Sequence, residues 1–261
     1  MKKTVNGVEL HYEIEGDGPW MTLSHSLACD SFMWEPQVKA LSSRYTVLRV
    51  DTRGHGKSGA PQGPYSLDML ARDFRELLDA LGIEKTHFAG LSMGGMIGQT
   101  FALSYPGVLQ SLILADTTSQ RASNAAQVWG DRIRQAQDKG MAPLVEPTLA
   151  RWFTELYRLA QPQIMKRFGD QIAATPVAGY TGCCAAIAEI DLTGRLHEIT
   201  CPALVIVGEQ DLGTTPDQAR TIQSNLPGSE LVILESAAHI SNVEQAPAFN
   251  RAMLDFLKRV A

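Results

Sequence analysis

Apolar residues are distributed along the chain in two patterns, one typical of helices and one typical of buried strands. Between Leu67 and Leu81 they return every three or four positions, which predicts an amphipathic helix that ends near Gly82. Short, almost wholly apolar runs such as ALVIVG at 203–208 predict buried strands. The pair Asn6-Gly7 lies between two expected strands, at 3–5 and 8–14, and predicts a tight hairpin at the start of the chain.

Expected strands and helices alternate over most of the sequence. The expected strands cover residues 3–5, 8–14, 20–24, 46–50, 86–91, 108–115, 203–208 and 230–234. The expected helices between them cover residues 33–41, 67–81, 93–104, 217–225 and 249–260. This alternation is typical of crossover connections, and it predicts a mostly parallel sheet.

The alternation is interrupted between residues 117 and 191. This stretch holds helical patterns at 125–139, 144–152 and 185–190 and no convincing strand. We therefore expect one α/β core formed by residues 1–116 and 192–261, with a helical insertion at 117–191.

Composition excludes several classes of protein. The chain has 261 residues, 44% of them hydrophobic and 20% charged, which is typical of a globular enzyme. A net charge of -5 argues against nucleic-acid binding. The four cysteines fit neither a disulfide framework nor a zinc site; they are Cys29, Cys183, Cys184 and Cys201. We see no secretory signal and no apolar run long enough to span a membrane, so we expect a cytoplasmic protein. The sequence leaves open whether the protein forms a homo-oligomer.

One motif indicates nucleophilic catalysis. Residues 90–94 read Gly-Leu-Ser-Met-Gly and match G-x-S-x-G, between an expected strand and an expected helix. This context is the one that a nucleophile elbow requires, because the sharp turn lifts the Ser92 hydroxyl clear of the sheet. A glycine-rich helix start that packs on a strand would match the same G-x-S-x-G pattern without any catalytic role.

A serine nucleophile needs a base and an acid that orients the base, and both follow the serine along the chain in this arrangement. His239 comes just after the last expected strand, and Asp211 just after the strand before it. All three residues are expected at the carboxyl edge of the sheet, where open α/β sheets bind ligands. Asp116 also follows a strand and is the competing acid, but the chain order favours Asp211.

The oxyanion hole needs two backbone N–H groups. The first is expected from Met93, directly after the serine, and the second from the loop at 24–28. The phosphate-binding alternatives fail, because the G-x-G-x-x-G match at 54–59 runs into a proline-rich stretch rather than a helix.

Together these segments resemble the α/β-hydrolase superfamily over almost the whole chain. The resemblance implies an eight-stranded, mostly parallel sheet with helices on both faces, a helical cap after the sixth strand and no cofactor or metal. Within the superfamily the chain looks most like the 3-oxoadipate enol-lactonases of aromatic-compound degradation, through segments 24–34, 51–65, 90–95, 151–154 and 239–244. Leu27 is then the second oxyanion position, and Ser26 stands where the superfamily more commonly has glycine.

The resemblance implies a small ester or lactone as the substrate, and a carboxylated lactone needs a cation in the pocket. Trp129 and Arg132 are three residues apart, on one face of an expected helix, and are the candidate substrate-binding residues. The run at 151–153, Arg-Trp-Phe, is a second candidate. A surface arginine beside a core tryptophan is the competing interpretation.

Four other functions stay open at this point. They are a general carboxylesterase, a cofactor-free perhydrolase or haloperoxidase, a hydrolase of carbon–carbon bonds, and a non-enzymatic ligand receptor. No proline follows His25, which argues against the perhydrolase, and a receptor has no need of a poised nucleophile.

Overall fold

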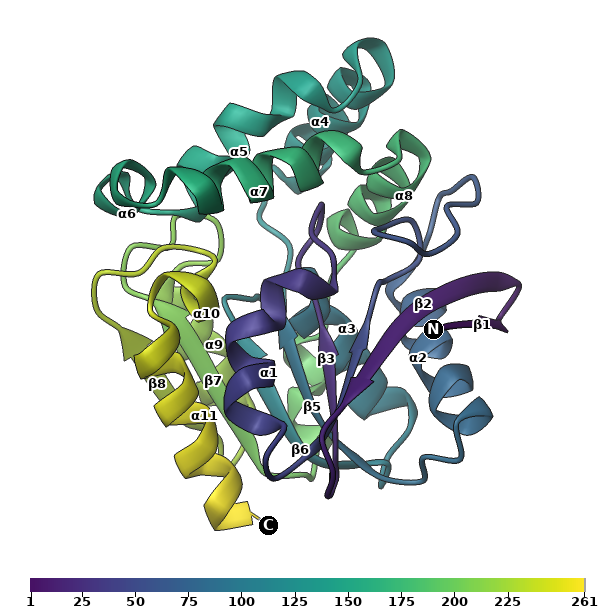
Figure 1. Ribbon diagram of the computed structural model, residues 1–261, viewed down its shortest axis with the longest axis vertical. Helices are drawn as coiled ribbons and strands as arrows, with labels where there is room; N and C mark the ends of the chain where they lie inside the picture. The colour runs from purple at the N-terminus through teal and green to yellow at the C-terminus, as the bar shows by residue number, and fades with distance from the viewer. Residues whose placement is uncertain (261) are drawn as a thin grey trace.

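A single twisted sheet forms the centre of the computed structural model, which describes residues 1–260 (Figure 1). The strand order is β1-β2-β4-β3-β5-β6-β7-β8. The strands are β1 (Lys2–Val5), β2 (Val8–Glu15), β3 (Trp20–Ser24), β4 (Thr46–Val50), β5 (Thr86–Leu91), β6 (Leu109–Ala115), β7 (Ala203–Gly208) and β8 (Glu230–Leu234). Pairing is antiparallel from β1 to β2 and from β2 to β4, and parallel elsewhere. The predicted eight-stranded, mostly parallel sheet is confirmed.

Local sequence explains the main elements of the core. Asn6 and Gly7 both have positive φ, at 44° and 72°, as the predicted two-residue hairpin requires. Every residue of β5 and of β7 is buried, as expected for parallel strands covered on both faces. The Ser66 side chain accepts a hydrogen bond from the Met69 N–H and caps the next helix, whose buried positions follow the predicted stripe.

Helices cover both faces of the sheet (Figure 1). On one face α1 (Glu35–Leu41) packs against α11 (Ala246–Val260). The other face carries α2 (Leu67–Ala80), α3 (Met93–Ser104) and α9 (Pro216–Asn225). The short elements η1 (Ser31–Trp34), η3 (Thr193–Glu198) and α10 (Ser241–Glu244) complete this part of the chain.

A layer of helices lies beyond the carboxyl edge of the sheet (Figure 1). We call it the upper helical layer. It consists of α4 (Ala125–Lys139), η2 (Ala142–Leu144), α5 (Val145–Trp152), α6 (Glu155–Ala160), α7 (Pro162–Ala174) and α8 (Val177–Ala188). All of these elements fall between β6 and β7 along the chain. None of the helices described within residues 1–260 is both long and apolar enough to cross a membrane.

The sequence interpretation of this layer was incomplete. It missed α6 and α7, and it placed a helix at 185–190 where α8 begins at Val177 and ends at Ala188. Two glycines, Gly179 and Gly182, lower the helix propensity of α8. The helix forms there because these glycines allow it to pack closely on the core, a tertiary effect that a periodicity cannot reveal.

Gly179 marks a close approach between the upper helical layer and the core. A Cβ atom built at Gly179 would collide with the backbone of Gly54, which itself has a φ of 83°. The two backbones can therefore meet only because both positions are glycine.

We expect Gly179→Ala to lower the free energy of unfolding by about 1–3 kcal/mol, the usual effect of overpacking a tight contact. Gly130→Ala in α4 is the matched control, because a Cβ there would meet only Arg134 Nη1 at 3.5 Å. That substitution should stabilise the protein by about 0.5–1 kcal/mol through helix propensity. Urea denaturation of both variants measures the difference, and equal effects would contradict the proposed contact.

Candidate active site

Ser92 lies at a strained turn between β5 and α3. Its backbone angles are φ 56° and ψ -115°, outside the regions that side-chain-bearing residues ordinarily adopt. The turn is held by two hydrogen bonds: the Ser92 N–H donates to Ala115 O at 2.9 Å, and Thr117 Oγ1 donates to Ser92 O at 2.7 Å. The flanking glycines are required, because a Cβ at Gly90 would collide with Gly94. The predicted strand–turn–helix context is present.

His239 and Asp211 form a buried pair at the same edge of the sheet. His239 Nδ1 lies 2.8 Å from Asp211 Oδ2, and the Asp211 carboxylate also accepts hydrogen bonds from the N–H groups of Gly213 and Thr214 at 2.8 and 3.0 Å. Burial alone would raise the pKa of Asp211, but the charge of His239 and the hydrogen bonds hold the pKa below its ordinary value. Asp211 is therefore an ionised acceptor that can orient the imidazole ring.

Asp116, the competing acid, has other partners. Its carboxyl group accepts hydrogen bonds from the Gly208 N–H at 2.8 Å and from Ser241 Oγ. Complete burial, together with repulsion from Asp211, raises the pKa of Asp116 well above its ordinary value. The structure thus brings Asp211, and not Asp116, against His239, as the chain order predicted.

Two backbone N–H groups beside the serine have no acceptor within residues 1–260. These are the N–H groups of Leu27 and Met93. Met93 is the first residue of α3, so its N–H also lies at the positive end of the helix dipole. Both groups are free to donate to an anionic ligand.

The loop that carries Leu27 is fixed by a buried histidine. His25 Nε2 accepts a hydrogen bond from the Thr52 N–H at 2.8 Å, so the proton sits on Nδ1 and is donated to Ser26 O at 2.7 Å. Burial lowers the pKa of His25, which favours this neutral form. His25 therefore positions the loop rather than taking part as a base.

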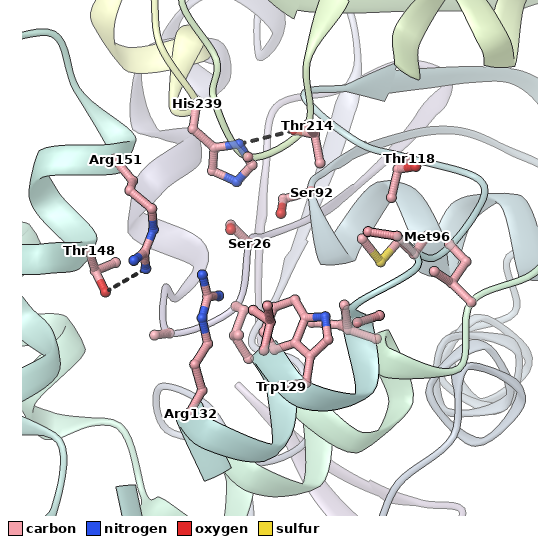
Figure 2. A pocket seen from close by; sticks show the side chains of 18 of the residues that line it. Ser26, Ser92, Met96, Thr118, Trp129, Arg132, Thr148, Arg151, Thr214 and His239 are labelled. Atoms are coloured by element: carbon pink, nitrogen blue, oxygen red, sulfur yellow. Dashed lines mark hydrogen bonds between the residues drawn. The ribbon is translucent and has the colours of Figure 1, made fainter. Parts of the chain in front are cut away.

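The serine and the histidine face one cavity of about 360 Å³ (Figure 2). Its walls come from the core and from α4, α5, α7 and α8 of the upper helical layer. Ser92, His239, Leu27, Trp129 and Arg132 all line it. The structure thus brings the predicted nucleophile, base, loop and cap residues to one space. Met93 is buried at the start of α3 and is not among the residues that line the cavity.

The cavity is electropositive. No Asp or Glu occurs among the described residues that line it, whereas Arg121, Arg132 and Arg151 do. Arg121 is paired with Glu189 at 3.0 Å, but neither Arg132 nor Arg151 has an acidic partner within residues 1–260. Figure 2 shows the guanidinium groups of Arg132 and Arg151 in the same part of the cavity.

The two arginines are held differently. The Arg132 guanidinium lies over the Trp129 ring, 4.5 Å from its centre, which agrees with the predicted shared helix face. Arg151 Nη2 donates a weak hydrogen bond to Thr148 Oγ1 at 3.4 Å. Burial, together with the charge of Arg132, lowers the pKa of Arg151. An anionic ligand would relieve this repulsion.

Two residues of the site were not singled out from the sequence. Thr214 Oγ1 donates to Asp211 Oδ2 at 2.6 Å and lies 3.2 Å from His239 Nδ1. The Glu244 carboxylate accepts the N–H groups of Ala238 and Thr154, at 2.9 and 3.0 Å, and so ties the His239 loop to the upper helical layer. Threonine and glutamate are common surface residues, so only their contacts reveal these roles.

Nothing in the site resembles a metal centre. Over the part of the chain that the structure describes, residues 1–260, no cluster of three or more His, Cys, Asp or Glu side chains could hold a metal ion.

Comparison with known proteins gives the class of this one. A family model described as alpha/beta hydrolase fold matches residues 19–246, and the chain belongs to this family. It is 38% identical over 258 residues to 3-oxoadipate enol-lactonase 2 of Acinetobacter baylyi, covering 98% of this chain and 96% of the relative. The predicted superfamily is therefore confirmed, and so is the predicted class of carboxylic ester hydrolase.

Solved structures agree with this assignment. The crystal structure of the enol-lactonase from Burkholderia xenovorans is 41% identical, with a TM-score of 0.96 over 99% of this chain and 100% of the other. A thermophilic esterase from Thermogutta terrifontis, solved with malate bound, is 28% identical, with a TM-score of 0.93 over 99% and 97% of the two chains.

The raised pKa of Asp116 predicts a pH-dependent stability. Above about pH 4 the unfolded chain ionises Asp116, whereas the raised pKa makes the folded protein release this proton only at higher pH, so this group lowers the stability of the wild type as the pH rises. Asp116→Asn removes the titration. We expect the stability of the variant relative to the wild type to increase between pH 4 and pH 7 in urea denaturation. A difference that stays constant with pH would show that Asp116 is ionised in the folded protein.

Proposed function

We propose that the protein hydrolyses carboxylate-bearing lactones or esters, and that an enol-lactone of the kind cleaved by 3-oxoadipate enol-lactonases is its substrate. The observation that carries this proposal is the cavity in which a serine at a strained turn and a buried His–Asp pair share space with two arginines that have no acidic partner. The serine and histidine supply the chemistry, and the arginines supply the preference for an anion.

Acylation begins when Ser92 Oγ attacks the lactone carbonyl carbon. His239 Nε2 takes the hydroxyl proton, while Asp211 holds Nδ1–H and stabilises the imidazolium that forms. The N–H groups of Leu27 and Met93 donate to the oxygen of the tetrahedral intermediate. His239 then returns the proton to the departing ring oxygen, which stays attached to the acyl chain because the substrate is cyclic.

Deacylation uses the same groups with water as the nucleophile. His239 Nε2 takes a proton from the water molecule, the hydroxide attacks the acyl carbon, and Ser92 Oγ leaves and regains its proton. The product has one more carboxylate than the substrate. No cofactor or metal ion takes part in these steps.

The arginines hold the carboxylate of the substrate away from the reacting carbonyl. A planar guanidinium can bind a carboxylate through two parallel hydrogen bonds, and stacking on Trp129 fixes the plane of Arg132. The related esterase from Thermogutta terrifontis was solved with malate, a dicarboxylate, bound to it, which supports an anionic ligand for this protein.

The proposal extends to the organisation of the chain. Residues 1–116 and 192–261 act as the hydrolase core, and residues 117–191 act as a cap that closes the cavity over the serine. The cytoplasmic location and the homo-oligomer considered from the sequence stay predictions.

We expect Ser92→Ala to abolish ester and lactone turnover, and Asp211→Asn to lower kcat by up to about 10⁴, because an amide cannot hold the required imidazole tautomer. Asp116→Asn should cost far less, since Asp116 does not contact His239. Steady-state kinetics on a p-nitrophenyl ester measures all three variants. The assignment of the acid would be wrong if Asp116→Asn were the more damaging change.

Substrate preference tests the arginines. Arg132→Ala and Arg151→Ala should each lower kcat/KM for a carboxylated lactone by roughly 10- to 100-fold, the value of a charge-assisted hydrogen bond of about 1.5–3 kcal/mol. Hydrolysis of a neutral short ester should change little. Arg132→Lys should lower kcat/KM less than Arg132→Ala does, because the lysine ammonium keeps the positive charge but cannot make the two parallel hydrogen bonds of a planar guanidinium.

Arg134→Ala is the matched control for this experiment. Arg134 is on the same helix as Arg132, but it is exposed and paired with Asp131. It should leave both substrates unaffected. Equal losses on the neutral and the carboxylated substrate would instead show that the arginines support the fold of the cavity, and a general carboxylesterase would then describe the protein better.

A further inference from the structure

The hydroxyl of Ser26 is buried, and it has no hydrogen-bond partner within residues 1–260. The residue is only 1% exposed, yet it lines the same cavity as Ser92. Figure 2 shows the Ser26 and Ser92 hydroxyls in the same part of the cavity, below the His239 ring. A buried polar group without a partner destabilises the fold. Because the Ser26 hydroxyl lies in the cavity, a bound ligand could supply the missing partner.

The backbone of Ser26 is already occupied. Its N–H contacts Met33 Sδ at 3.2 Å, and its carbonyl oxygen accepts hydrogen bonds from His25 Nδ1 at 2.7 Å and from the Cys29 N–H at 3.1 Å. These contacts fix where the side chain begins. The hydroxyl is therefore the one polar group of this residue that is free to act in the cavity.

We propose that Ser26 is a catalytic residue whose Oγ–H donates a third hydrogen bond to the oxyanion, beside the N–H groups of Leu27 and Met93. The inference rests on the proposed function and adds a donor to it. Ser26 directly precedes Leu27, so the hydroxyl and the Leu27 N–H are carried by one rigid loop next to the serine. The hydroxyl donates without transferring its proton, and the proton balance of the acylation step is unchanged.

The reason for such a donor is electrostatic. A hydrogen bond to an oxyanion in a buried site is stronger than one to a neutral carbonyl, so the Ser26 hydroxyl stabilises the tetrahedral intermediate more than the bound substrate. An interaction of this kind lowers the barrier without tightening substrate binding. Its removal should therefore reduce kcat and leave KM unchanged.

Ser24 provides the matched control. Its hydroxyl is also buried and without a partner among residues 1–260, two positions earlier in the same segment, but the residue does not line the cavity. Ser24→Ala and Ser26→Ala thus each remove one buried hydroxyl that has no partner among residues 1–260. Only one of them removes it from the site.

The experiment measures kcat and KM on a series of neutral p-nitrophenyl and alkyl esters. Removing one oxyanion donor typically costs 10²–10³ in kcat, and we expect Ser26→Ala to cost roughly 10- to 100-fold, because two backbone donors remain. KM should stay within about twofold, and Ser24→Ala should be near wild type. The inhibition constant of an alkyl boronic acid, which mimics the tetrahedral intermediate, should rise by the same factor as kcat falls.

Two further variants separate chemistry from folding. Ser26→Thr keeps a hydroxyl and should recover part of the rate, whereas Ser26→Gly should be as slow as Ser26→Ala. Thermal denaturation of each variant shows whether it is folded. If Ser26→Ala does not fold, the comparison of Ser26→Thr with Ser26→Gly carries the test.

Three results would overturn the inference. The first is an unchanged kcat in Ser26→Ala, and the second is an effect of this substitution on KM alone. The third is a loss of kcat that grows steeply with the pKa of the leaving alcohol. That dependence would show that the Ser26 hydroxyl donates to the leaving oxygen instead of the oxyanion. Stoichiometric labelling of Ser92 by a serine-directed phosphonate distinguishes these from failure of the proposed function. A labelled enzyme with normal Ser26→Ala kinetics refutes only the third donor, whereas an unlabelled Ser92 refutes the acyl-enzyme itself.

Discussion

The backbone turn at Ser92 is the constraint on which the rest of the site depends. A serine with φ 56° and ψ -115° is costly, and it persists because the surrounding chain leaves no alternative. The Ser92 N–H donates to Ala115 O of the adjacent strand, and Thr117 Oγ1, just after that strand, donates to Ser92 O. Glycines on both sides of Ser92 let the backbones of β5, α3 and β3 approach closely. The same turn brings Ser92 to the cavity and leaves the Met93 N–H without an acceptor within residues 1–260, so one strained turn places both the proposed nucleophile and a proposed oxyanion donor.

Charge divides the site into two regions. Near the sheet, the ionised Asp211 carboxylate accepts hydrogen bonds from Thr214 Oγ1 and from the N–H groups of Gly213 and Thr214, and it contacts His239 Nδ1, so its charge orients the ring. Farther out, Arg132 and Arg151 face a cavity without a compensating acid. Because like charges repel strongly in partly buried surroundings, this second region is suited to an anionic substrate. In the proposed function, the preference for carboxylates comes from the upper helical layer and the chemistry from the core.

Most of the core could be predicted from the sequence. The strands at 20–24, 46–50, 86–91, 203–208 and 230–234 agree with the structure at both ends, because each is a short apolar run bounded by turns. The strands at 86–91 and 203–208 are buried throughout, as expected for parallel strands covered on both faces. The positions of Ser92, Asp211 and His239 after such strands follow from the same pattern. In the upper helical layer the prediction failed for α6, α7 and the first part of α8. In α8 two glycines and weak amphipathicity conceal a helix that tertiary packing stabilises.

The sequence by itself determined the alternating core, the serine turn and the order of serine, acid and base, because each of these depends on local residue pattern or on where a strand ends. The chain order favoured Asp211 over Asp116, but both residues follow strands, and only the tertiary structure shows that Asp211 contacts the histidine while Asp116 contacts Gly208. It also decided that Arg151 shares a cavity with Arg132, and that the Ser26 hydroxyl is buried without a partner beside Ser92. Distances between residues far apart in the chain are set by how whole helices and strands pack together, and the spacing of residues along the sequence does not predict that packing.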